Sequence, residues 1–288
     1  MEGKSNKEYL EELLSGSQVL LQRHANSQFN YEDTALKEKD YTDEEYKVLR
    51  IKDELRDAPL SQLGIDQCLE AQQIANKLTV EVILVSPLRR TLETAYHTFK
   101  EHSNFENIEF ILTPNLREAI DTTWDIPVNI LEVVEDFKAK FKHFDTSALE
   151  SYEDPVHYYL YDTDQEFAKK ILKNMEKDET DPCGTTARKL LYKHITEHYP
   201  DKTENNESIL KRIDVARNVV KKIFETKKLQ ENSKVVCIAH SYYFKWWTGK
   251  WNKPLDDYET IPMPDDSVWL DNCQFLPDND NFPRNKSE

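Results

Sequence analysis

The chain has 288 residues and a formal net charge of −16, with 38% hydrophobic and 32% charged residues. That length is enough for one large domain with its own core, and so acidic a protein is a poor partner for nucleic acid or an anionic membrane. With five glycines, the sequence contains neither a G-x-G-x-x-G loop nor a Walker A motif, which excludes the nucleotide-binding folds built on those loops.

Four short runs of apolar and β-branched residues are predicted to be strands. They cover 18–23, 81–86, 108–113 and 234–239. Their apolar residues are consecutive rather than alternating, which is typical of strands buried on both faces, as in a parallel sheet. A fifth run, 267–276, alternates more strongly and is predicted to be an edge strand.

Helical patterns alternate with these strands. Apolar residues recur at helical spacing over 64–78, 88–100 and 207–227. This order predicts an α/β fold, a three-layer sandwich with a mostly parallel central sheet and right-handed crossovers. The aromatic run 242–251 follows the last buried strand, and we interpret it as a buried helix rather than a ligand-binding motif.

One long segment has a different composition. Residues 119–206 are rich in Tyr, Asp, Glu and Pro and show no strong strand pattern. We predict a single domain over 1–288, with 119–206 as a largely helical insertion over the carboxyl edge of the strands. We expect the insertion to cap the site, and its acidic, Tyr-rich surface also suits a protein partner. The polar segment 277–288 is expected to be disordered.

The cysteines and the N-terminal segment indicate the compartment in which the protein is expected. Without C-x-x-C pairs or a neighbouring His at metal-ligand spacing, the four cysteines are predicted to be free thiols: Cys68, Cys183, Cys237 and Cys273. The N-terminal segment has no apolar core of a signal peptide, and no run approaches the ~18 apolar residues of a membrane helix. We therefore expect a cytoplasmic protein without a membrane span.

Basic side chains follow three of the four predicted buried strands. Arg23 and His24 follow the first, the segment 86–90 with Arg90 follows the second, and His240 follows the fourth. Because the carboxyl ends of parallel strands face one crevice, these groups are expected to meet there. Each alone would suit a structural or surface residue, but together, in an acidic protein, they form a site for a dianionic phosphate.

Six sequence boxes lie at and between these places: LLQRHANSQFN (20–30), DAPLSQLGIDQCLEAQQIA (57–75), VSPLRRTLETA (85–95), LRE (116–118), ESILKRI (207–213) and VVCIAHS (235–241). Together they resemble the histidine phosphatase superfamily, the group that includes the cofactor-dependent phosphoglycerate mutases, and they follow that family's order over about half of the chain. LLQRHANSQFN is similar to the family's R-H-G-x-S-x-x-N box, and VSPLRRTLETA is similar to its S-x-L-x-R-x-x-x-T-A box.

The resemblance implies a role for each matching residue. His24 would be the nucleophile that forms a phosphohistidine, Glu118 the general acid and then base, and His240 a donor to the transferring phosphoryl group. The implied phosphate-binding set is Arg23, Ser27, Asn30 and Arg90. No metal and no cofactor is implied, because Arg and His groups would supply the charge neutralisation that Mg²⁺ gives at other phosphoryl-transfer sites.

Two positions depart from the family's pattern. Ala25 and Ser241 stand where the family has the glycine after each histidine, a residue that allows close approach of the backbone and positive φ. The leading hypothesis is a metal-independent phosphomonoesterase acting on a small phosphorylated substrate or a phosphoprotein. One alternative is a catalytically weak or inactive member that serves as a binding or scaffold subunit. Another is a phosphoglycerate-type mutase, although Asn26 replaces the mutases' acidic residue.

Overall fold

The structure of the chain is a computed structural model. It describes residues 5–39, 41–50, 52–119, 123–125, 127–152, 155, 158–161, 206–249 and 266–283. No helix within these ranges is both long and apolar enough to cross a lipid bilayer.

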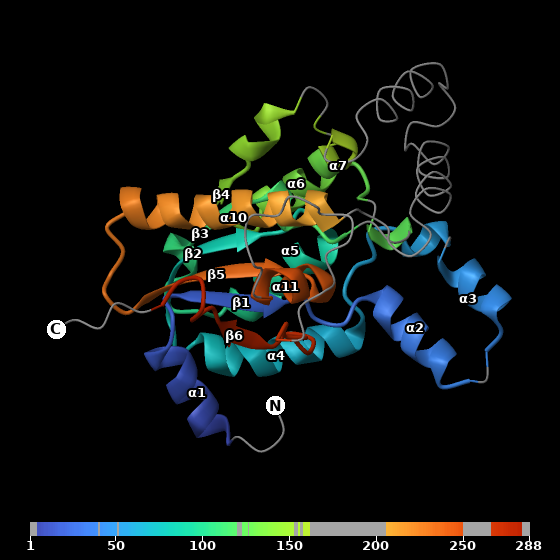
Figure 1. Cartoon of the computed structure of the whole chain (residues 1–288), viewed down its shortest axis with the longest axis horizontal. Coiled ribbons are helices and arrows are strands. Elements are labelled where there is room, and N and C mark those ends of the chain that lie inside the picture. Colours follow the sequence, from blue (N-terminus) through green and yellow to red (C-terminus); the bar gives the residue numbers. More distant parts are fainter. Residues whose placement is uncertain are drawn as a thin grey trace.

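A six-stranded sheet with the order β4-β3-β2-β5-β1-β6 forms the centre of the molecule (Figure 1). All neighbouring strands are parallel except β6, which runs antiparallel to β1. The predicted mostly parallel sheet is therefore confirmed, and the edge strand lies at the end of the range predicted for it. The strands are β1 Val19–Arg23, β2 Thr79–Val85, β3 Glu109–Leu112, β4 His143–Asp145, β5 Ser233–Ala239 and β6 Phe275–Pro277.

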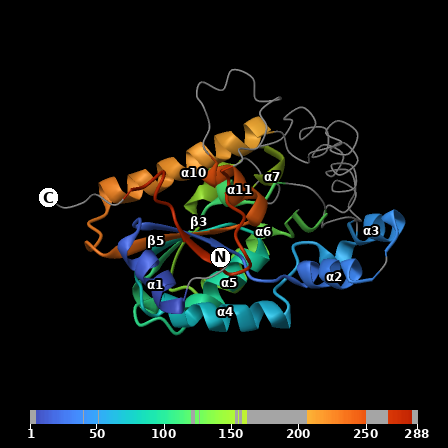
Figure 2. The same ribbon diagram turned by 60° about the horizontal axis from the view of Figure 1, so that its bottom comes forward.

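Helices cover both faces of the sheet and complete the predicted three layers (Figures 1 and 2). Side chains alternate between the two faces of each strand: Leu20 of β1 belongs to one core, whereas Val19 and Leu21 belong to the other. The first core takes in α1 Asn6–Ser15, α4 Gln62–Ala75, α5 Arg89–Phe99 and α6 Ile130–Lys138. The second core takes in α10 Asn206–Thr226 and α11 Ser241–Thr248.

Residues 130–145 belong to the sandwich itself. The apolar side chains of α6 are buried in the first core, and β4 pairs in parallel with β3, from Glu109 opposite His143 to Ile111 opposite Asp145. The sequence of 119–206 shows no strong strand pattern, and β4 is not detected there because a strand of three residues is too short to show one. Helix α7 Tyr158–Tyr161 follows, and 162–205 lie outside the described residues, so the cap stays a prediction.

The segment from Pro277 onward is held against the sandwich as far as residue 283. The backbone N–H of Asp278 donates to the carbonyl of Val19 at 2.9 Å, and the indole N–H of Trp247 donates to the Asp278 carboxylate at 2.7 Å. Phe282 packs against the second core. This order differs from the disorder expected from composition, and residues 284–288 lie outside the described ranges.

Two helices leave the sandwich after β1 and project from its body (Figure 2). These are α2 Gln28–Lys37 and α3 Asp43–Arg50. Four buried side chains form a small core there, with Trp124 packed against it: Phe29, Leu49, Leu55 and Ala58. Five short 3-10 helices complete the described structure: Asp53–Leu55, Phe105–Asn107, Pro114–Leu116, Thr123–Asp125 and Ser147–Ser151.

Three of the four cysteines lie in the described structure. Cys68, Cys237 and Cys273 are free and buried, as predicted. Cys183 lies outside the described ranges. Burial raises the pKa of the Cys237 thiol, in keeping with an unreactive residue inside β5.

Candidate active site

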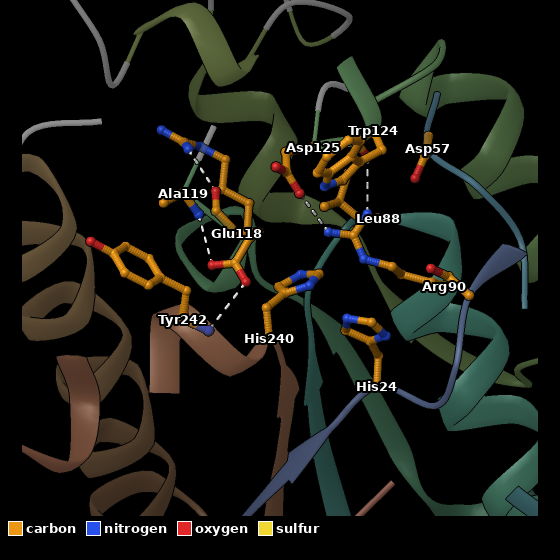
Figure 3. Close-up of polar contacts among 12 residues, drawn as sticks. His24, Asp57, Leu88, Arg90, Glu118, Ala119, Trp124, Asp125, His240 and Tyr242 are labelled. Atoms are coloured by element: carbon orange, nitrogen blue, oxygen red, sulfur yellow. Dashed lines mark hydrogen bonds and ion pairs between the residues drawn. The ribbon is translucent and has the colours of Figure 1, made fainter. Parts of the chain in front are cut away.

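Six of the seven predicted site residues line a single cavity of about 290 Å³. They are Arg23, His24, Ser27, Asn30, Arg90 and Glu118. The seventh, His240, lies beside His24, and the centroids of the two imidazole rings are 5.1 Å apart (Figure 3). Within the described ranges, no group of three or more His, Cys, Asp or Glu side chains is placed to hold a metal ion.

His24 lies immediately after β1 with its imidazole in one tautomer. Its Nδ1 is 2.7 Å from the carbonyl oxygen of Ala25. A carbonyl can only accept, so Nδ1 carries the proton and Nε2 carries the lone pair. Burial, followed by the charges of Arg90 and Arg23, holds the pKa of His24 well below its usual value. The ring is therefore neutral near pH 7, which is the form that a nucleophile requires.

His240 lies between β5 and α11, where it is fully buried. Its Nε2 is 2.8 Å from the hydroxyl of Ser86, which follows β2. Its Nδ1 is buried and has no hydrogen-bond partner among the described residues. Burial, followed by the charges of Arg90 and His24, holds the pKa of His240 well below its usual value, so the ring is neutral near pH 7.

The two arginines are held by groups that the sequence did not identify. Arg23 Nη1 donates to the carbonyl of Leu270 at 2.9 Å. Arg90 donates from Nη1 to the carbonyl of Trp124 at 3.0 Å and from Nη2 to Asp125 Oδ1 at 2.9 Å (Figure 3). In the sequence, the only feature that could have indicated the partners of Arg90 is a Trp-Asp pair shortly after the L-R-E box. That pair lies in the segment interpreted as part of the insertion.

The ion pair between Arg90 and Asp125 fixes the guanidinium in the cavity. Both side chains are buried, with 5% and 2% of their surface exposed. Removing one partner of a buried pair leaves an uncompensated charge, which costs ~3–5 kcal/mol. We therefore expect Asp125→Ala to lower the free energy of unfolding by about 3 kcal/mol and kcat/KM for phosphomonoesters by about 10- to 100-fold. Denaturant titrations and steady-state kinetics measure both.

Asp125→Asn is the matched variant for this prediction. It keeps an oxygen acceptor for Arg90 Nη2 and loses only the charge. We expect it to recover part of both losses, because the guanidinium keeps its orientation. An Asp125→Ala protein with wild-type stability and kcat/KM would show that Asp125 does not position Arg90.

Glu118 binds the N-terminus of α11. Its Oε1 accepts from the backbone N–H groups of Ala119 at 2.9 Å and Tyr243 at 3.0 Å, and its Oε2 accepts from that of Tyr242 at 3.3 Å. Burial raises the pKa of the carboxyl group and outweighs the N–H donors and the Arg90 charge, which lower it. A carboxyl group with a raised pKa beside the cavity is suited to proton transfer.

Ser27 and Asn30 form the capping box at the start of α2. The Ser27 hydroxyl donates to Asn30 Oδ1 at 2.9 Å, and the Ser27 backbone N–H reaches the same oxygen at 3.2 Å. Both Ser27 donors that were expected to bind phosphate are thus used within the cap. Ser27 shapes the loop, and the Asn30 amide oxygen is committed to it, so the Asn30 NH₂ group is the donor of this pair that remains for an anion.

The two departures from glycine cause no backbone strain. Among the described non-glycine residues, positive φ occurs at Asp57 (45°) and Cys273 (61°), not at Ala25 or Ser241. The Ala25 N–H donates to the Thr94 hydroxyl at 3.0 Å, and Ser241 is the first residue of α11. The structure therefore needs glycine at neither position.

The second sequence box builds the loop that carries His24. At the start of α4, the Ser61 N–H donates to the Asn26 carbonyl at 3.0 Å, and the Ser61 hydroxyl donates to Asn26 Oδ1 at 2.7 Å. Gln67 Oε1 accepts from the Asn26 N–H at 2.8 Å. Asp57, before this helix, accepts from the Arg89 N–H at 2.7 Å and so connects the box to α5. The box thus positions the catalytic loop without entering the cavity.

Gly64 allows this contact between α4 and the loop. A Cβ atom there would lie 2.0 Å from the carbonyl oxygen of Asn26. We expect Gly64→Ala to destabilise the protein by about 3 kcal/mol, because helix and loop must separate. Thermal and denaturant unfolding measure the loss. Gln62→Ala, at an exposed position of the same helix, is the control and should change stability by less than ~0.5 kcal/mol. Equal stability of the two variants would contradict the prediction.

Sequence comparison connects this geometry with a known family. A family model described as histidine phosphatase superfamily, branch 1, matches residues 19–157, which include the first four boxes. Residues 19–157, just under half of the chain, belong to the histidine phosphatase superfamily. The family resemblance seen in the sequence is therefore confirmed.

One curated protein and two solved structures show the extent of the similarity. A Schizosaccharomyces pombe protein named "Probable phosphatase" is 34% identical over 102 residues, which are 35% of this chain and 44% of that protein. This chain thus matches less than half the length of that curated relative. A mycobacterial glucosyl-3-phosphoglycerate phosphatase solved with VO3 has a TM-score of 0.42 and 15% identity, over 89% of this chain and 88% of that one. The ecdysone phosphate phosphatase of Bombix mori, solved with tungstate, has a TM-score of 0.41 and 14% identity, over 89% and 86%.

Proposed function

We propose that this chain is a metal-independent phosphomonoesterase that works through a phosphohistidine intermediate. One observation carries the proposal: His24, whose Nε2 holds the lone pair, lines the same cavity as Arg23 and has its ring 5.1 Å from that of His240, and both neighbours carry buried donors that lack a partner among the described residues. These donors are Arg23 Nε and His240 Nδ1. Buried polar groups are nearly always hydrogen-bonded, so unpaired donors around a nucleophile indicate a site prepared for an oxyanion.

In the first step, the Nε2 lone pair of His24 attacks phosphorus and an N–P bond forms. The ester P–O bond breaks, and Glu118 gives its proton to the departing oxygen. Arg23 and Arg90 bind the phosphoryl oxygens and offset the charge that spreads over them in the transition state. The Asn30 NH₂ group and His240 Nδ1–H, with Ser86 donating to Nε2, complete the donor set.

In the second step, Glu118 is a carboxylate and takes a proton from water. The water oxygen forms a P–O bond, the N–P bond breaks, and inorganic phosphate leaves. His24 is then neutral again and Glu118 is protonated, so both groups are ready for the next cycle. Nothing else is consumed, which is consistent with a hydrolase that needs neither metal nor cofactor.

The substrate is proposed to be a phosphorylated molecule of the cytoplasm, either a small molecule or a phosphoprotein. Buried free thiols at Cys68, Cys237 and Cys273 suit a reducing compartment. The absence of strain at Ala25 and Ser241 supports an active enzyme rather than a silent scaffold subunit.

Turnover of p-nitrophenyl phosphate in the presence of EDTA, between about pH 4 and 8, tests the proposal. We expect release of p-nitrophenol that EDTA does not reduce. A parallel assay with 3-phosphoglycerate should form no 2-phosphoglycerate. A folded protein, as shown by circular dichroism, that hydrolyses neither ester would contradict the proposal, and formation of 2-phosphoglycerate would favour a mutase instead.

A further inference from the structure

Aromatic side chains form a large part of the cavity that holds the site. Phe29, Trp124, Tyr242 and Trp269 line it together with the arginines and His24. They come from four separate segments of the chain, namely α2, the 3-10 helix at 123–125, α11 and the stretch before β6. Phe29 occupies an unspecified position of the first family box, the other three lie outside the boxes, and the proposed chemistry uses none of these rings.

Trp124 is fixed with respect to the arginine that would bind phosphate. Its indole stacks on Phe29, with ring centroids 3.4 Å apart and planes at 18°. Its carbonyl oxygen accepts from Arg90 Nη1 at 3.0 Å. The same residue thus holds Arg90 through its backbone and presents an aromatic wall to the cavity (Figure 3). A phosphoryl group on Arg90 would place the next atoms of the substrate near that wall.

The other two residues line the same cavity as the group that would protonate the leaving oxygen. The backbone N–H of Tyr242 donates to Glu118 Oε2 at 3.3 Å, so this residue is next to the proposed acid. Trp269 is 54% exposed, and the ammonium of Lys245 lies 5.4 Å from the centroid of its ring. Aromatic residues therefore line the cavity that also holds the proposed acid.

The charged groups of the cavity are sufficient for one phosphate. Its described charged lining consists of Arg23, Arg90, Glu118 and Asp125, and Asp125 already pairs with Arg90. No further arginine or lysine in the described part of the chain lines the cavity to bind a second anionic group. A substrate with a second phosphate or a carboxylate would bury an uncompensated charge, whereas a neutral aromatic group would be favourable.

We propose that the preferred substrates are monophosphate esters whose leaving group is uncharged, flat and aromatic, with its ring packed against Trp124. This proposal rests on the proposed phosphomonoesterase function and specifies its substrate class. The aromatic group could belong to a small molecule or to a tyrosine side chain of a peptide, since both present the same ring beside the phosphate. In either case, Trp124 determines specificity.

Two alkyl phosphates separate ring recognition from leaving-group acidity. Benzyl phosphate and glycerol 2-phosphate both release an alcohol, but only the first carries a ring. We expect the wild-type kcat/KM to be about tenfold or more higher for benzyl phosphate, the advantage of burying and stacking one ring. Trp124→Ala should remove most of this ratio and Trp124→Phe should keep part of it. Tyr31→Ala, an exposed aromatic position of α2 outside the cavity, is the control and should leave the ratio unchanged.

The outcomes distinguish this proposal from the function on which it rests. If neither ester is hydrolysed, the phosphomonoesterase function fails. If wild type hydrolyses both esters with equal kcat/KM, or if Trp124→Ala keeps the full ratio, the specificity proposal is overturned while the enzyme stands. A comparison of phenyl phosphate with a neutral phosphotyrosine peptide then identifies whether the aromatic group belongs to a protein or to a small molecule. A much higher kcat/KM for the peptide than for phenyl phosphate indicates a protein substrate, and an equal or lower kcat/KM indicates a small molecule.

Discussion

Replacing His24 with alanine is expected to lower kcat/KM for phosphomonoester hydrolysis by about 10⁴-fold or more. His24 is a neutral imidazole that lines the cavity together with the two arginines, whereas His240 is not among the residues that line it. Its Nδ1–H is bound to the Ala25 carbonyl at 2.7 Å, so Nε2 is the atom available to phosphorus. Steady-state assays with p-nitrophenyl phosphate and with benzyl phosphate measure the loss.

Trapping the intermediate makes the prediction specific to the nucleophile. Rapid quenching of the wild-type protein with a ³²P-labelled ester should leave label on the chain that is lost in acid and survives in base, as a phosphoramidate does. The His24→Ala protein should carry none. His143→Ala, at an exposed position of β4, should label like the wild type. Labelling of a folded His24→Ala protein, or activity above a tenth of wild type, would assign the nucleophile elsewhere.

The parts of the fold that the sequence revealed are those with a strong local signal. Consecutive apolar residues indicated β1, β2, β3 and β5, because strands buried on both faces have no polar face to interrupt the run. Their carboxyl ends then placed Arg23, His24 and His240 at one crevice before any distance was known. In contrast, β4 has three residues, of which one is apolar, and its position is set by pairing with β3 rather than by its own pattern.

The parts of the site that the sequence missed depend on contacts between distant segments. Asp125 faces Arg90 across the fold, and no spacing in the sequence relates a carboxylate after the L-R-E box to an arginine of α5. The second box was recognised as a family feature, but its function in holding Asn26 through Ser61 became evident only from the hydrogen bonds. The family has glycine at the position of Ala25, yet the backbone there does not adopt positive φ, which the sequence could not show.

Glu118→Gln is expected to lower kcat for alkyl phosphates by about 10²- to 10⁴-fold, because glutamine cannot protonate the departing oxygen. The pH profile provides a second readout. Burial raises the pKa of Glu118 above its ordinary value, so the proton donor persists to higher pH and activity falls as pH rises through that raised pKa. The variant should lack this alkaline limb. Measurement of kcat for benzyl phosphate from about pH 4 to 9 checks both effects.

The leaving group supplies the internal control. The p-nitrophenolate ion departs without a proton, so Glu118→Gln should slow its ester far less than benzyl phosphate whenever formation of the phosphoenzyme limits the rate. A purely structural role would slow both esters equally. That role is real but small: Gln keeps an oxygen for the N–H groups of Ala119 and Tyr243 but loses the acceptor for Tyr242, a cost of ~1 kcal/mol. The comparison is made on kcat/KM, which depends only on the steps up to formation of the phosphoenzyme. Equal losses of kcat/KM for the two esters, or an unchanged alkaline limb, would assign the proton to another group and leave Glu118 as the cap of α11.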